Sequence, residues 1–316
     1  MIRGVCKEEN YCSHFDQHSP SPKQLEKRSP SFLVFERKAR AVEIIVVGNE
    51  LLNGTTVDTN SNWLSRQLVQ CGAIVERKMT VPDDVGEISD AFKRTLERKP
   101  AWIFFLGGLG PTFDDKTVKG LGLALKRKIK RNKVAVEMLR QSYRRRPEDL
   151  GVSKKGRLAK SSLKMADLPV GSRPFLNPVG SAPGVIYTSG SCQIVALPGV
   201  PKELRAIFLE EVRPLIRKRL PPFKEMEEWM KVVGVGEPKI APYLEKVLEK
   251  YSPEIYVKSH AMGFRKGKSV LKIQLMATAP EKYSIVVHKK LTNATKQMEK
   301  VALRLGGKVE HTKSIS

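Results

Sequence analysis

Short β-branched runs alternate with amphipathic stretches over the first two thirds of the chain. Residues 42–48 and 102–106 are apolar runs of strand length, which is typical of strands buried on both faces of a sheet. Between them, Asp58 precedes an apolar stripe at helical spacing that ends at Gly72, which predicts a helix. A strand pattern follows over 73–78. A second helical pattern begins at Asp84 and ends near residue 98. This βαβαβ alternation predicts an α/β fold, in which helices cover both faces of a mostly parallel sheet.

The remaining patterns complete this unit and begin another. Helices are expected over 116–126, 133–145 and 201–218, and strands over 184–188 and 193–197. Pro221 and Pro222 then mark a domain boundary. After it the patterns predict a strand over 230–235, a helix over 240–251, strands over 255–259 and 270–277, and a helix over 283–305. Residues 1–40 have no sustained period. We therefore expect a flexible tail over 1–40, an α/β domain over 41–220 and a small α+β domain over 221–316.

Composition excludes several classes of protein. The chain of 316 residues is 41% hydrophobic, which is enough for large cores, yet its apolar runs are far shorter than the roughly 20 residues needed to span a membrane. Its four cysteines, at positions 6, 12, 71 and 192, do not form the spacing of a disulfide framework. The N-terminus lacks the pattern of a secretory signal. These features favour the cytoplasm and no association with membranes.

The formal net charge of +24 favours an anionic partner. The densest stretch, residues 126–146, holds ten lysines and arginines against one glutamate and has a helical pattern. Such a stretch is typical of a nucleic-acid-binding surface, of a surface that attracts anionic small molecules, or of a solvated helix face. The charge therefore indicates a class of partner and leaves its identity open.

A glycine-rich segment directly after the buried strand 102–106 is the most informative part of the sequence. Its glycines leave backbone N–H groups uncovered, and the next helix presents its positive end to the same place. The candidate phosphate-binding residues are Gly107, Gly108, Gly110 and Thr112, with Thr117 as a further hydroxyl donor. Asp114 and Asp115 would repel a phosphate unless a divalent cation compensates their charge, and the alternative is that one of them caps the helix.

Polar residues also follow the first and last strands of the predicted sheet. Glu50, Asp58 and Asn60 come after the first strand, and parallel strands bring them to the same edge as the Asp114–Asp115 pair. Alternatively, Asp58 caps a helix and Glu50 is a solvated loop residue. The segments 177–184 and 197–203 offer further ligand contacts through Ser181, Gly199 and Lys202, although either segment could be a turn without a ligand.

Five motifs, taken in order, point to a family. They are GNELLNGTTVDTN (48–60), GGLGPTFDDKT (107–117), RLAKSSLKMADLP (157–169), NPVGSAPG (177–184) and LPGVPKE (197–203). Together they resemble the MoaB/Mog-like domain of the competence-damage-inducible CinA family. The resemblance implies a three-layer α/β/α domain that binds a nucleotide or a pterin, a KH-like α+β domain after it, and self-association into a homo-oligomer. This chain would lack the deamidase domain found in many members.

The activity that the resemblance implies is metal-dependent hydrolysis of ADP-ribose to AMP and ribose 5-phosphate. Asp58 and Asp115 would bind Mg²⁺, Mn²⁺ or Co²⁺, Asp114 or Glu50 would orient the water, and Lys164 or Lys202 would face the phosphates. Both lysines could equally be ordinary surface residues. The alternative functions are molybdopterin binding during cofactor assembly and nucleic-acid binding. Gly263 to Gly267 is one residue longer than the usual GxxG clamp of KH domains, which weighs against RNA binding there.

Overall fold

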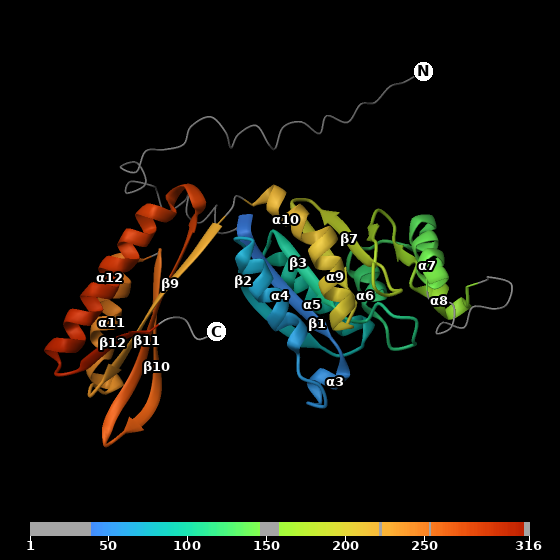
Figure 1. Cartoon of the computed structure of the whole chain (residues 1–316). Coiled ribbons are helices and arrows are strands. Elements are labelled where there is room, and N and C mark those ends of the chain that lie inside the picture. Colours follow the sequence, from blue (N-terminus) through green and yellow to red (C-terminus); the bar gives the residue numbers. More distant parts are fainter. Residues whose placement is uncertain (1–38, 146–157, 221–222, 253, 313–316) are drawn as a thin grey trace. The chain divides into compact units, whose positions relative to one another are not determined.

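The computed structural model describes residues 39–145, 158–220, 223–252 and 254–312 (Figure 1). The predicted tail over residues 1–40 lies almost entirely outside these ranges. Two sheets organise the described chain, one of six strands and one of four. Of the helices described, none combines the length and the apolar character required to cross a membrane.

The six-stranded sheet is mostly parallel, as the sequence predicts. Its order is β2 (Ile74–Val81), β1 (Ala41–Val47), β3 (Trp102–Leu106), β8 (Cys192–Leu197), β7 (Gly184–Ser189) and β6 (Arg173–Phe175). The first four run parallel, whereas β7 is antiparallel to both of its neighbours. The predicted fold class, a mixed α/β domain built on a mostly parallel central sheet, is confirmed. The carboxyl ends of β1, β3 and β8 consequently meet at one edge.

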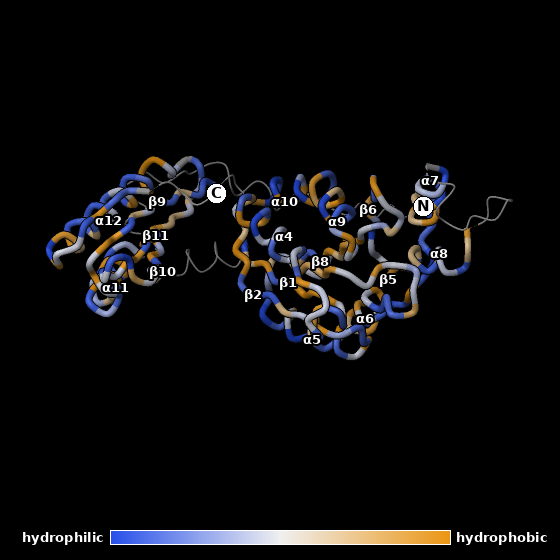
Figure 2. The backbone as a smooth tube through the Cα atoms, turned by 60° about the horizontal axis from the view of Figure 1, so that its bottom comes forward, coloured by the Kyte–Doolittle hydropathy of each residue, from blue (hydrophilic) through white to orange (hydrophobic). Residues whose placement is uncertain are grey.

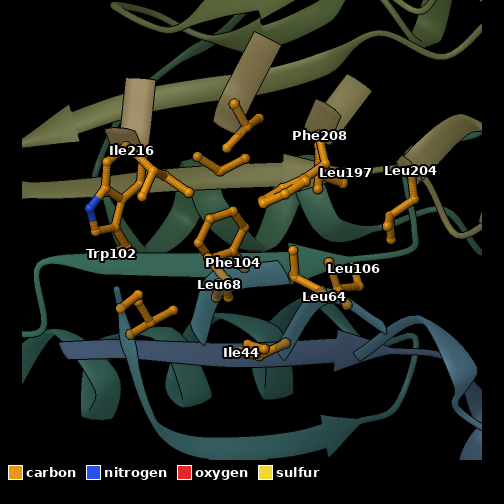
Figure 3. Packing of buried hydrophobic residues seen from close by; sticks show 14 of the residues in the cluster. Ile44, Leu64, Leu68, Trp102, Phe104, Leu106, Leu197, Leu204, Phe208 and Ile216 are labelled. Atoms are coloured by element: carbon orange, nitrogen blue, oxygen red, sulfur yellow. The ribbon is translucent and has the colours of Figure 1, made fainter. Parts of the chain in front are cut away.

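Helices cover both faces of this sheet. One face packs against α4 (Thr59–Gln70), α9 (Pro201–Ile207), the π-helical turn Phe208–Val212 and α10 (Arg213–Arg219), and Figure 3 shows this core. The other packs against α5 (Val85–Glu97), α6 (Thr117–Ala124) and α7 (Lys133–Arg145). Alternate residues of β3 divide between the two cores: Trp102 and Phe104 enter the first, and Ile103 and Phe105 enter the second. Burial on both faces explains why β3 reads as an unbroken apolar run.

Several short elements have no counterpart in the sequence prediction. They are α3 (Asn49–Leu52), α8 (Lys160–Lys164), the edge strand β6, and a two-stranded antiparallel sheet of β4 (Ile129–Arg131) and β5 (Asp167–Pro169). Arg131 forms an ion pair with Asp167 across that small sheet. The basic stretch 126–146 is therefore not one continuous helix, because β4 occupies its first half and α7 its second.

The C-terminal residues form a four-stranded antiparallel sheet with helices on one face. Its elements are β9 (Phe223–Val233), α11 (Glu237–Tyr251), β10 (Ile255–Arg265), β11 (Lys268–Pro280), a 3-10 turn (Glu281–Tyr283), α12 (Ser284–Arg304) and β12 (Lys308–Thr312), and the strand order is β10-β11-β9-β12. Residues from α11 and α12 enter the core of this sheet, and Figure 2 shows α12 as a mixture of hydrophobic and hydrophilic positions. The predicted βαββα pattern is thus extended by a sixth element, the edge strand β12.

Candidate functional site

The loops after β1, β3 and β8 meet at the carboxyl edge of the six-stranded sheet. The Asn60 side chain donates a hydrogen bond from Nδ2 to the Gly199 carbonyl oxygen at 2.6 Å. A Cβ atom placed on Gly199 would lie 3.5 Å from the Gly107 Cα. These contacts join three predicted candidates, Asn60, Gly107 and Gly199, which are far apart in the sequence. The expected convergence of the loops at one edge is therefore present at these positions.

Glycine is required at the start of the loop after β3. Gly107 has φ of 98°, and a Cβ there would lie 2.5 Å from the Val47 carbonyl oxygen. Gly108 has φ of 67°, and its Cβ would lie 2.3 Å from the Thr117 hydroxyl oxygen. That buried hydroxyl donates to the Gly107 carbonyl oxygen at 2.8 Å, so Thr117 fixes the loop and is not available to a ligand. The N–H groups of Gly108 and Gly110 find no acceptor within the described parts of the chain.

Thr112 holds the two consecutive carboxylates beside this loop. One oxygen of Asp115 accepts from the Thr112 N–H at 2.8 Å and from its hydroxyl at 2.6 Å, and Asp114 also contacts that hydroxyl. The helix-capping alternative is wrong for both residues, because Lys116 is the N-cap of α6 and no side chain caps it. The hydrogen bond from Thr112 lowers the pKa of Asp114, with further contributions from its own backbone, Lys164 and Lys116. Asp114 is therefore ionised at neutral pH.

Lysine side chains supply positive charge next to this acidic pair. Lys164, at the end of α8, is half-buried and its ammonium group donates to the Thr112 carbonyl oxygen. Burial lowers the pKa of Lys164 and Lys119 lowers it further, while the charges of Asp115 and Asp114 act in the opposite direction. The compensation that the sequence assigned to a divalent cation is thus provided in part by lysine. The contact of Lys164 with Thr112 is not among the sequence predictions, and its predicted role facing the phosphates stays a prediction.

The predicted metal ligand Asp58 is occupied as a helix cap. Its carboxylate accepts from the Ser61 N–H at 2.9 Å and also contacts the Ser61 hydroxyl, at the start of α4. Across the described ranges, His, Cys, Asp and Glu side chains nowhere gather in threes in a way that could hold a metal ion. The donors fit a cation that arrives with the ligand, because Mg²⁺ is commonly bound by one or two carboxylates together with phosphate oxygens and water. The exposed Asp114 and the half-buried Asp115 suit that kind of binding.

Two polar side chains lie beside the loop after β1. Glu50 belongs to α3 and is exposed, and its carboxylate lies over Gly48, where a Cβ would be 2.5 Å from Glu50 Oε1. Asn60 Oδ1 is buried and accepts no hydrogen bond from any side chain or backbone group of the described ranges. A buried acceptor of this kind is costly unless a donor reaches it. The role of Asn60 in ligand binding stays a prediction.

The buried Asn177 connects the segment 177–184 to α9 through hydrogen bonds. Its amide donates to the Ala182 carbonyl oxygen at 2.8 Å and to Glu203 Oε2 at 2.6 Å, and its Oδ1 accepts from the Gly180 N–H at 2.7 Å. Sequence reasoning missed the part played by Asn177 and Glu203, because an acid in the first turn of a helix is common and carries no signal of a distant partner. The hydroxyl of Ser181 lies 3.4 Å from that of Ser142.

The last predicted candidate, Lys202, is exposed at the start of α9. No hydrogen bond or ion pair from Lys202 to another described residue is present, so the structure assigns it no partner. Its suggested contact with a ligand stays a prediction.

Comparison with known proteins agrees with this architecture. The model of the family described as "Probable molybdopterin binding domain" matches residues 43–218. A protein from Aeropyrum pernix is 39% identical over 274 residues, which cover 86% of this chain and 97% of its own. A protein from Sulfolobus acidocaldarius is 35% identical over 268 residues, which cover 85% of this chain and 97% of its own.

Among solved structures, a crystal structure of the protein CinA with unknown function from Thermoplasma acidophilum is 38% identical, with a TM-score of 0.50, and the match covers 56% of this chain and 98% of that one. The predicted MoaB/Mog-like domain is confirmed by these matches, and the KH-like assignment of residues 221–316 stays a prediction. The chain therefore belongs to the family described as "Probable molybdopterin binding domain".

Proposed function

We propose that the carboxyl edge of the six-stranded sheet binds the diphosphate of a nucleotide and that the protein hydrolyses ADP-ribose to AMP and ribose 5-phosphate with the help of a divalent cation. The observation that carries the proposal is the loop after β3. Its Gly108 and Gly110 N–H groups have no acceptor among the described residues, and the loops after β1 and β8 lie against it. Uncovered N–H groups ahead of a helix are a common way to bind phosphate.

The charged side chains around the loop support hydrolysis. Lys164 and Lys116 lie near the carboxylates and would also attract the phosphates. Asp114, ionised and exposed, orients the attacking water, whose proton passes to the solvent, and Glu50 is the alternative for the orienting role. The water oxygen forms a bond to one phosphorus while the anhydride bond breaks, and the bridging oxygen leaves on the other phosphate. Asp114 and Asp115 would hold the cation, which neutralises phosphate charge and lowers the pKa of bound water.

The experiment is incubation of the full chain with ADP-ribose, with and without Mg²⁺, Mn²⁺ or Co²⁺, followed by chromatography for both products. We expect AMP and ribose 5-phosphate in equal amounts, and their loss in Asp115→Asn. Asp90→Asn is the matched control, because Asp90 pairs only with Lys93 on the exposed face of α5 among the described residues. Unchanged turnover in Asp115→Asn, or no product with any of the three cations, refutes the hydrolase proposal.

A second candidate function is molybdopterin binding without turnover. It is favoured by the family match and by the buried acceptor Asn60 Oδ1, which suits the N–H groups of a pterin. This function predicts that the chain binds molybdopterin and that Asn60→Leu weakens binding, because a ligand donor then loses its acceptor. Product formation from ADP-ribose together with no detectable molybdopterin binding would exclude it.

A further inference from the structure

A polar pocket lies at the end of the six-stranded sheet where β3 and β8 begin, opposite to the edge where the loops after β1, β3 and β8 meet. Its volume is about 190 Å³. The hydrogen-bonding side chains of its lining are those of Arg173, Thr188, Gln193 and Arg219. None of the described residues that line the pocket carries a carboxylate. The pocket is therefore basic, and it is separate from the candidate site.

The strand pairings place this lining on a single face of the sheet. Trp102 pairs with Gln193, and Gln193 pairs with Thr188 on the next strand. Arg173 pairs with Ile186, which belongs to the first core. Because cross-strand partners share a face, all these side chains lie on the face that α10 covers. Two arginines thus reach one pocket from different elements, Arg173 from β6 and the other from the end of α10.

The guanidinium group of Arg219 is held by two neighbours. Its central carbon lies 5.8 Å from the centre of the Trp102 ring. In the amide orientation that gives partners to both polar atoms of Gln193, Oε1 accepts from Nη1 and Nη2 of Arg219 at 3.2 Å, and Nε2 donates to the Thr188 hydroxyl at 3.1 Å. Gln193 is 4% exposed, so a buried amide fixes this cation. The remaining N–H groups of the guanidinium are left for another acceptor.

Arg173 is positioned by a ring of its own strand. Its guanidinium carbon lies 4.9 Å from the centre of the Phe175 ring. Neither Arg173 nor Arg219 forms an ion pair with a carboxylate of the described chain. Two positive charges that line one pocket repel each other, and an anion between them removes this repulsion. Because both guanidinium groups are already held, little side-chain freedom is lost when an anion binds.

A phosphate group suits these donors better than a single carboxylate does. A carboxylate has two oxygens, which one guanidinium fork occupies, whereas the three terminal oxygens of a phosphate monoester can accept from two forks at once. Such a phosphate carries a charge of about −1.5 to −2 at pH 7, which offsets two arginines. The pocket is smaller than the roughly 300 Å³ at which sites for larger ligands begin, so its occupant is small.

We propose that Arg173 and Arg219 bind a phosphate group, either the free ion or that of a small monoester, with the Thr188 hydroxyl as a further donor. Neither the family match nor the proposed hydrolysis assigns a ligand to this end of the sheet. The proposal does not depend on the ADP-ribose activity, because that site lies at the opposite edge.

The test is equilibrium dialysis of the full chain against radiolabelled phosphate and radiolabelled ribose 5-phosphate, in EDTA so that no divalent cation contributes. Arg173→Gln and Arg219→Gln should each weaken binding about 10- to 150-fold, since a hydrogen bond to a charged group contributes about 1.5–3 kcal/mol. Both residues are exposed, so the variants should fold. Arg173→Lys/Arg219→Lys keeps the charge and loses the forks, so its affinity should lie between those of the native chain and Arg173→Gln/Arg219→Gln.

Arg66→Gln/Arg94→Gln is the matched control, because it removes two exposed arginines from α4 and α5 of the same domain. It should bind like the native chain. Phosphate bound at the loop after β3 would persist in every variant, so the pocket is identified by the equivalents that the Arg173 and Arg219 variants lose.

Tighter binding of ribose 5-phosphate than of phosphate would support the monoester as the ligand, and the reverse order would support the free ion. Equal weakening by the control pair and the pocket variants overturns the proposal. So does an unchanged number of bound equivalents in Arg173→Gln/Arg219→Gln. Succinate that competes through the two arginines at lower concentration than either phosphate compound would also overturn it, because the site would then be one for carboxylates.

Discussion

Replacement of Asn177 should clearly destabilise the segment 177–184, which lies beside the candidate site. Asn177 is 4% exposed and its amide takes part in four hydrogen bonds: it donates to Ala182 and Glu203 and accepts from the N–H groups of Val179 and Gly180. A neutral hydrogen bond contributes about 1 kcal/mol net and one to a charged group about 2 kcal/mol. Asn177→Ala should therefore lower the free energy of unfolding by about 3–5 kcal/mol, allowing for water that replaces part of the network.

The assay is urea unfolding followed by tryptophan fluorescence. Trp63 and Trp102 report on the first core, and a Trp229→Phe background removes the signal of the other sheet. The control is Asn53→Ala, because the exposed Asn53 amide accepts hydrogen bonds from Thr55 and from no other described residue; this change should cost less than about 1 kcal/mol. If Asn177→Ala also cost less than about 1 kcal/mol, the reasoning that this network holds the loop would be refuted.

Three further predictions concern the same α/β domain. Gly107→Ala should lower the free energy of unfolding by at least about 2 kcal/mol, because the positive φ and the close approach of the Val47 carbonyl oxygen leave no room for a methyl group. Equal midpoints of urea unfolding for the variant and the native chain would contradict this. Glu43→Gln should cost about 2 kcal/mol, since Glu43 is 1% exposed and accepts from Arg98 Nε at 2.7 Å, and a double-mutant cycle with Arg98→Gln should show the two changes to be coupled. Burial raises the pKa of Cys71 and raises that of Cys192 to about 12, so in the native state at pH 8 both thiols should resist iodoacetamide, and peptide mass spectrometry showing rapid labelling would count against the buried placement.

Strands buried on both faces and capped helices could be predicted from the sequence. The bounds of β3 agree with the predicted apolar run to the residue, because contact with helices on both faces requires apolar side chains at every position. Asp58 and Asp84 cap α4 and α5. These caps could be predicted because the preference of aspartate for the N-cap position depends only on the local sequence. The strand β12 has no such signal. Only one of its five residues is apolar, and its partner β9 is far away in the sequence.

The positions of the loops at the candidate site could be predicted from the sequence, but the charged contacts between them could not. Parallel strand order is enough to bring the loops after β1 and β3 to one edge. The contact between Lys164 and Thr112 joins residues 52 positions apart, so no local pattern could show that lysine offsets the acidic pair. Thr117 likewise looks like a ligand donor in the sequence, and only the closeness of the Gly107 carbonyl shows that its hydroxyl is already used.

The reversed direction of β7 has a practical consequence. Because β7 runs against β8, their connection turns at Gly190, at the end of the sheet opposite to the edge where the loops after β1, β3 and β8 meet. Gly190 is exposed, and a side chain there would meet no atom within 4 Å. An affinity tag or a fluorescent reporter inserted after Gly190 should therefore be tolerated. Within this domain, attachment through the turn would leave the carboxyl edge of the six-stranded sheet on the side away from the attachment point.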